Sequence, residues 1–110
     1  MRRRELVLAD LIHYNGEIQK LQNELSQYSW DLESPLVIFE KQDLINILEK
    51  VLQNEIAFND LEAWANIIEC RDDIGYSDER VKEYIFEFAN PILNEVLSKE
   101  YLGKIIKNLA

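Results

Sequence analysis

Residues 43–52 read DLINILEKVL, and their apolar side chains fall at the spacing of one face of an α-helix. The stripe occupies positions i, i+3, i+4, i+7 and i+8, which are Leu44, Ile47, Leu48, Val51 and Leu52. Side chains at these steps lie on the same side of a helix, so the stretch predicts a helix with one buried stripe.

Before this stretch, apolar residues recur in alternating steps of four and three along residues 7–28. The stripe is made of Val7, Leu11, Tyr14, Ile18, Leu21, Leu25 and Tyr28. Asn15-Gly16 interrupts it, and this dipeptide lowers helix propensity. Because the stripe keeps its phase across the dipeptide, we expect one long helix here.

Beyond residue 52 the pattern predicts further helices separated by short breaks. One begins at Asn59, with Glu62 completing a capping box, and buries Leu61, Trp64, Ala65 and Ile68. Residues 71–77 break the periodicity, with Gly75 as the expected turn and Ser77 as the cap of the next helix. That helix presents Val81, Tyr84, Ile85 and Phe88.

The C-terminal part of the chain contains two more helix boundaries. Asn90-Pro91 predicts the end of one helix and the start of another, because proline suits the first helical position. Ser98 is the expected cap of a final helix that carries Leu102, Ile105, Ile106 and Leu109.

Residues 36–39 form the one apolar run that suits a short strand. No second strand candidate is present to pair with it, so a buried extended turn or helix entry is favoured. Residues 29–35 before it read as a loop. The sequence therefore predicts an all-α fold, a compact single-domain bundle of five or six helices over residues 1–110.

The charge of the chain indicates the kind of partner it would attract. The 110 residues carry 21 acidic and 12 basic side chains, and Arg2, Arg3 and Arg4 are three of the bases. The remaining nine bases leave residues 5–110 with a net charge of −12. Such a field repels nucleic-acid phosphates and anionic lipid and attracts basic proteins.

Cellular location is read from cysteine usage and hydropathy. Cys70 is the single cysteine and cannot form an internal disulfide, and the N-terminus carries no long apolar stretch. No run of residues is long and apolar enough to span a membrane. We therefore expect a cytoplasmic protein.

Catalytic equipment is sparse, so we expect no enzyme and no cofactor. His13 is the single histidine and is expected to be a surface or boundary residue of the first helix. Cys70 is expected to be a small buried hydrophobe. The acids near Cys70 lack the register of a calcium-binding loop, so no metal site is predicted.

Acidic and aromatic side chains in residues 71–79 are the candidate partner-binding site. The predicted binding residues are Asp72, Asp73, Tyr76, Asp78 and Glu79, with Tyr76 as aromatic anchor and Arg71 paired to one acid. Asp31, Glu33 and Glu40 form a competing acidic patch. Trp30 is either a second anchor or a core residue.

Four short motifs carry a family resemblance across most of the chain after residue 17. They are Ser29-Trp30-Asp31, Leu61-Glu62-Ala63-Trp64-Ala65, the run from Glu69 to Gly75, and Phe88-Ala89-Asn90-Pro91. Together they resemble small bacterial helical proteins that include immunity proteins of contact-dependent growth inhibition and related toxin systems. The resemblance implies a cytoplasmic inhibitor without enzymatic activity that binds one cognate toxin, often a cationic nuclease, and blocks its active site.

Two other functions remain as alternatives to an immunity protein. A helical adaptor or regulator that binds another protein has the same composition, and a carboxylate-dependent hydrolase is more distant. The neighbouring genes discriminate among them: a toxin gene directly upstream would support the immunity protein, and its absence would weaken it.

Overall fold

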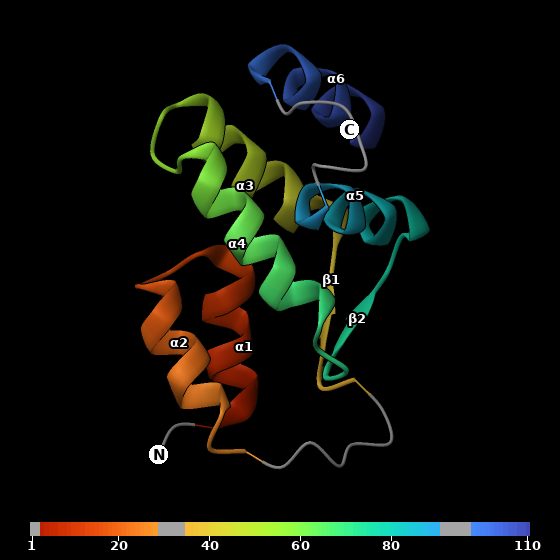
Figure 1. Ribbon diagram of the computed structural model, residues 1–110. Coiled ribbons are helices and arrows are strands. Elements are labelled where there is room, and N and C mark those ends of the chain that lie inside the picture. The colour runs from red at the N-terminus through yellow and green to blue at the C-terminus, as the bar shows by residue number, and fades with distance from the viewer. Residues whose placement is uncertain (1–2, 29–34, 91–97) are drawn as a thin grey trace.

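The computed structural model describes residues 3–28, 35–90 and 98–110, which form six helices and two short strands. In chain order the elements are α1 (Arg4–His13), α2 (Ile18–Leu25), β1 (Val37–Phe39), α3 (Lys41–Leu52), α4 (Phe58–Glu69), β2 (Ile74–Tyr76), α5 (Glu79–Ala89) and α6 (Lys99–Leu109). Figure 1 shows α1 and α2 side by side at one end and α6 at the other, with α3, α4 and α5 between them. The predicted all-α bundle is confirmed.

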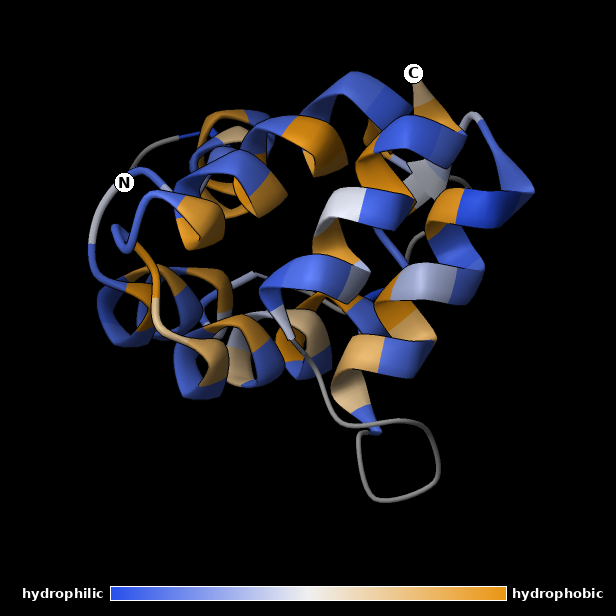
Figure 2. Ribbon diagram, turned by 90° about the horizontal axis from the view of Figure 1, so that it is seen from above, coloured by the Kyte–Doolittle hydropathy of each residue, from blue (hydrophilic) through white to orange (hydrophobic). Residues whose placement is uncertain are grey.

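The helices pack around one apolar core. Their apolar stripes turn inward, and their polar faces lie outside (Figure 2). Helix α4 packs mainly on α5, and α3 packs on α6. The Cα radius of gyration is 13.6 Å, close to the roughly 13 Å expected for a compact domain of this length. Among the described residues, no helix is both long and apolar enough to cross a membrane.

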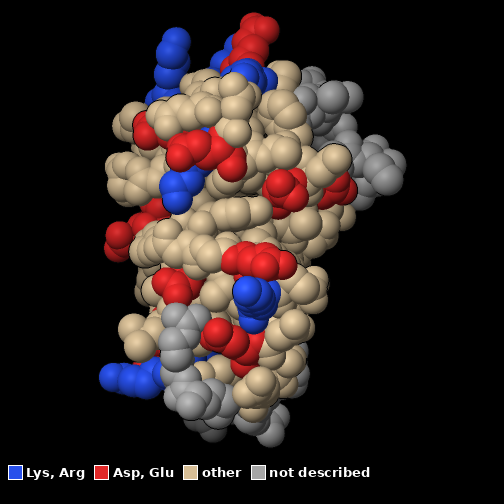
Figure 3. Space-filling view, turned by 90° about the vertical axis from the view of Figure 1, so that its left-hand side faces the viewer, with Lys and Arg blue, Asp and Glu red and all other residues tan. Residues whose placement is uncertain are grey.

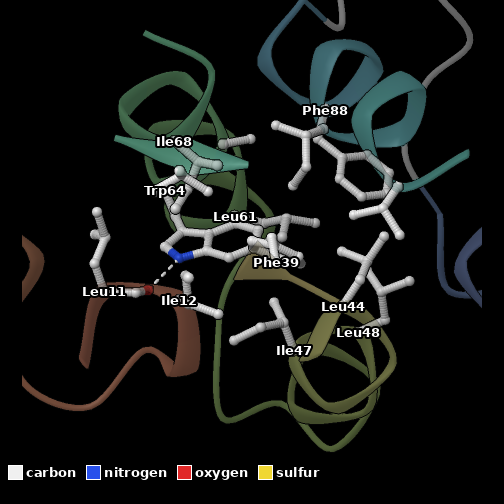
Figure 4. Close-up of a cluster of buried hydrophobic side chains, with 14 of the residues drawn as sticks. Leu11, Ile12, Phe39, Leu44, Ile47, Leu48, Leu61, Trp64, Ile68 and Phe88 are labelled. Carbon is white, nitrogen blue, oxygen red and sulfur yellow. Dashed lines mark hydrogen bonds between the residues drawn. The ribbon is translucent and has the colours of Figure 1, made fainter. Parts of the chain in front are cut away.

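Trp64 lies at the centre of the core, as the sequence predicts. Its side chain has no exposed surface, and its ring centroid lies 5.8 Å from that of Phe39. The indole Nε1 donates a hydrogen bond of 2.7 Å to the carbonyl oxygen of Leu11 (Figure 4). This bond joins α4 to the C-terminal turn of α1, where the Leu11 oxygen also accepts from the Tyr14 N–H.

The single long helix predicted for residues 7–28 is wrong, because the chain turns between α1 and α2. Tyr14 ends α1 in the left-handed conformation (φ 56°), and Gly16 follows with φ 108°. A glycine adopts such an angle without the strain that a Cβ atom would add. The apolar spacing continues across the turn because each of the two helices directs its own part of the stripe toward the core.

The expectation of no strand pair is also wrong. β1 and β2 form a two-stranded parallel sheet in which Val37, Ile38 and Phe39 lie opposite Ile74, Gly75 and Tyr76. Gly75 is therefore a strand residue and not the expected turn. A Cβ atom at this position would lie 3.0 Å from Ile38 Cδ1 and 3.1 Å from Pro35 Cγ, so glycine permits the close approach of these side chains.

Of two predicted helix starts, the caps confirm one and correct the other. Ser98 caps α6 as expected, because its side chain accepts a hydrogen bond from the Tyr101 N–H at 3.1 Å. Helix α4 begins at Phe58, with Ala57 as a cap that makes no side-chain bond, so the capping box predicted at Asn59 is wrong. The buried face of α4 is as predicted.

The boundaries of α5 differ in a similar way. Asp78, and not Ser77, caps its N-terminus. At the other end, the Asn90 side chain donates a hydrogen bond of 2.8 Å to the Phe86 carbonyl oxygen and caps the C-terminus of α5. The helix predicted to start at Pro91 lies outside the described residues.

Candidate binding groove between β2 and α5

A surface groove of about 550 Å³ lies beside β2 and beneath α5. All three residues of β2 line it, with the C-terminal end of α4 on one side and one face of α5 on the other. The lining residues are Glu69, Arg71, Asp72, Ile74, Gly75, Tyr76, Glu79, Lys82, Ile85 and Phe86. We call this the β2–α5 groove. Its volume lies within the roughly 300–1,000 Å³ of protein ligand sites.

Three carboxylates line the β2–α5 groove. Glu69, Asp72 and Glu79 are exposed, whereas Lys82 is the single exposed cation among the lining residues. Arg71 also lines the groove, but its guanidinium is held by Asp73. The groove therefore presents a negative surface, which favours a cationic ligand.

An exposed aromatic side chain adds an apolar contact to the groove. Phe86 is 51% exposed although it is large and apolar. Ile85, the preceding residue of α5, is buried and also lines the groove. An exposed aromatic next to a concave surface is the kind of residue that anchors protein partners.

Tyr76 lies in β2, and not in an exposed loop as predicted. Its ring is half-buried and stacked on Phe39, with centroids 6.0 Å apart and planes at 30°. Burial, and to a smaller extent the Glu69 carboxylate, raises the pKa of Tyr76 to about 12.

Asp73 does not face a partner, and its prediction as a binding residue is corrected. It is only 3% exposed, and Arg71 binds its two carboxylate oxygens at 2.8 and 2.7 Å. Arg4 lies 3.7 Å from the same carboxylate, and its guanidinium also stacks 5.0 Å from the ring centre of Tyr28. The expected pairing of Arg71 is confirmed.

Asp78 is also engaged within the fold. Its side chain accepts a bond from the Arg80 N–H at 2.9 Å and holds the Arg80 guanidinium at 2.8 Å. Hydrogen bonds from Arg80 lower the pKa of Asp78 to about 2. The Arg80 guanidinium also donates a hydrogen bond of 2.7 Å to the Asn108 carbonyl oxygen. Arg80 therefore connects the start of α5 to α6.

Of the five predicted binding residues, Asp72, Tyr76 and Glu79 come together around the groove. Sequence reasoning missed Glu69, Lys82 and Phe86, which reach it from the helices on either side. The exposed apolar position at Phe86, outside the stripe of α5, is a signal that could have been used. Asp31 and Glu33 of the competing patch lie outside the described residues, as does Trp30. Glu40 is exposed and forms a capping box with Asp43 at the start of α3.

The remaining reactive side chains lie away from the groove or at its margin. His13 is exposed, as expected, with Nε2 3.2 Å from Asp43 Oδ1. Cys70 is exposed at the C-terminal cap of α4, so the prediction of a buried thiol is wrong. Within the described ranges, no group of three or more histidine, cysteine or acidic side chains is placed to hold a metal ion.

Charge alone does not single out a binding face. On the side drawn in Figure 3, acidic side chains are scattered over the surface with basic ones among them. The β2–α5 groove is distinguished by its concave shape and its exposed aromatic ring together with its charge. Comparison of the chain with protein-family models, with curated proteins and with solved structures finds no match.

Proposed function

We propose that this chain is an immunity protein that binds a basic, nuclease-type protein toxin at the β2–α5 groove and blocks the toxin's active site. One observation carries the proposal: Asp72, Tyr76 and Glu79 lie around a single groove that also exposes Phe86. An aromatic contact surrounded by carboxylates suits a cationic protein surface. The net charge of −9 would speed the encounter with such a partner.

The sequence motifs support the same function. They resemble immunity proteins, and the proposed protein would act in the cytoplasm, where it meets the toxin before the toxin reaches its target. No catalytic step is required of the chain, because blocking needs only a stable complex.

The test is co-expression with the product of the adjacent upstream gene, which the proposal expects to be the toxin. The wild-type chain should restore growth and copurify with the toxin. A groove variant, Glu69→Gln with Asp72→Asn and Glu79→Gln, should lose both properties while keeping its helical circular dichroism.

A matched control separates the effect of charge in the groove from the effect of the net charge of the chain. Glu49→Gln with Glu55→Gln and Asp60→Asn makes the same change in charge at exposed positions that do not line the groove. This control should rescue growth as the wild type does. Equal loss in both variants would show that net charge alone matters, and rescue by both would move the interface elsewhere. Absence of rescue and of binding by the wild type would favour an adaptor or regulator.

A further inference from the structure

β2 has a main-chain edge that pairs with no other strand in the described part of the chain. Asp73 accepts hydrogen bonds from Leu36 and Val37 through its carbonyl oxygen, and the Ser77 N–H donates to Phe39 at 3.2 Å. Successive residues of a strand point their N–H and C=O groups to opposite sides. Residues 73, 75 and 77 therefore face β1, and Ile74 and Tyr76 face away from it.

The N–H and C=O groups of Ile74 and Tyr76 on that side belong to no ladder; Tyr76 is half-buried and Ile74 is 4% exposed, so an incoming strand must displace the side chains that cover Ile74. Across residues 3–28, 35–90 and 98–110, no hydrogen-bond partner outside the ladder is found for the main chain of either residue. We call these two N–H and two C=O groups the open edge of β2. An edge of this kind is a template for another strand.

The open edge lies in the β2–α5 groove. Every residue of β2 lines the groove and none of β1 does, so the groove runs along the side of β2 that faces away from β1. Gly75 contributes no side chain between its two neighbours. A third strand would run about 4.8 Å from β2, with Phe86 and the groove carboxylates beside it.

We propose that the partner enters this groove as an extended, lysine- or arginine-rich segment and adds a third strand to the sheet at the open edge of β2. The inference rests on the proposed function and names how the partner is held. Main-chain bonds to Ile74 and Tyr76 would fix the segment, as in other strand-addition complexes. Its alternate side chains would meet Phe86 on one face and Glu69, Asp72 and Glu79 at the rim.

Charge complementarity selects a basic segment as the occupant. Three exposed carboxylates line the groove against the one exposed cation, Lys82. A segment rich in acids would be repelled by the same three groups. The Lys82→Gln substitution should accordingly tighten the binding of a basic segment.

The probe for this test is a capped hexapeptide of alternating lysine and valine, titrated into the isotope-labelled chain and followed by NMR. The amide signals of Ile74 and Tyr76 should shift and their hydrogen exchange should slow. The amides of Gly75 and Ser77 already point toward β1 and should change less. The counterpart with glutamate in place of lysine should not bind.

Peptides N-methylated at every second residue provide the matched control, because methylation removes the N–H donor and keeps the charge. An added strand pairs with β2 through one edge only. Methylation of the residues whose N–H groups face β2 should weaken binding by about tenfold or more, and methylation of the alternate residues should have little effect.

Equal binding by both methylated peptides would overturn strand addition, because it would show recognition by charge alone. Failure of every peptide while the chain still binds the co-expressed toxin would overturn it too, and would leave the proposed function standing. Loss of both peptide and toxin binding would remove the inference and the proposed function together.

Discussion

Replacing Trp64 tests the centre of the core. The side chain is fully buried against Phe39, and it supplies a donor to the Leu11 carbonyl oxygen at the end of α1 (Figure 4). Two variants separate these contributions. Trp64→Phe keeps an aromatic ring and removes the N–H donor, whereas Trp64→Ala also removes the ring.

The two losses differ in expected size. In Trp64→Phe the Leu11 oxygen keeps the Tyr14 N–H at 3.2 Å, so the lost hydrogen bond costs about 1 kcal/mol. The smaller ring adds roughly 1 kcal/mol of lost burial. Trp64→Ala leaves a cavity and should cost roughly 3–5 kcal/mol. A domain of this size has a free energy of unfolding of roughly 5–15 kcal/mol, so the alanine variant should be close to unfolding.

Urea unfolding followed by circular dichroism at the helical band measures both values. Phe86→Ala serves as the control, because that side chain is half-exposed and should cost less than about 1 kcal/mol. A loss below about 1 kcal/mol in Trp64→Ala would refute the full burial of this side chain in the core. A Trp64→Phe variant as stable as the wild type would refute the role of the indole hydrogen bond.

Three further predictions concern the junction between α4 and α5. Arg71→Met should cost about 3 kcal/mol in urea unfolding, because it leaves the buried carboxylate of Asp73 without its closest partner; no loss would contradict the buried pair. The pKa of Asp78 is lowered from 3.8 to about 2, so its carboxylate stabilises the fold above about pH 4 and this contribution disappears as the pH falls toward 2. Thermal unfolding of Asp78→Asn should accordingly change less over this range than that of the wild type. The thiol of Cys70 should react with a thiol reagent in the folded chain at a rate close to that in denaturant, and strong protection would contradict its exposed position.

The helices were predictable from the sequence because the spacing of their apolar residues indicates which face is buried. The stripe from Leu44 to Val51 is buried in α3, and Leu61, Trp64, Ala65 and Ile68 are buried in α4. Helix ends were less predictable. A side-chain cap adds only about 1 kcal/mol, so tertiary packing can start α4 at Phe58 without one.

The turn and the sheet were missed for reasons of length. The α1 to α2 turn takes only residues 14–17, and a stripe can keep its phase across so few residues. Each strand has three residues, too few for an alternating pattern to be visible. Pairing between residues 37–39 and 74–76 depends on how α3 and α4 pack, because these helices bring the two strands together. No local pattern in the sequence indicates this long-range arrangement.

The acids of residues 71–79 show why a cluster in sequence is not a cluster on the surface. In the bend before β2, Asp72 is exposed and Asp73 is buried, and Asp78 caps the start of α5 while Glu79 lines the groove. Neutralising all four acids would remove a buried ion pair and a helix cap together with the groove charge, so a loss of binding could reflect unfolding.

Restricting substitutions to Glu69, Asp72 and Glu79 avoids that ambiguity. These three carboxylates are exposed, and within the described ranges none of them is held in a side-chain hydrogen bond or ion pair. Their removal should leave the free energy of unfolding nearly unchanged. If steering by these groups matters, their removal should slow association and reduce its salt dependence while the dissociation rate changes less. A variant that binds as fast as the wild type at low salt would place the attraction outside the groove.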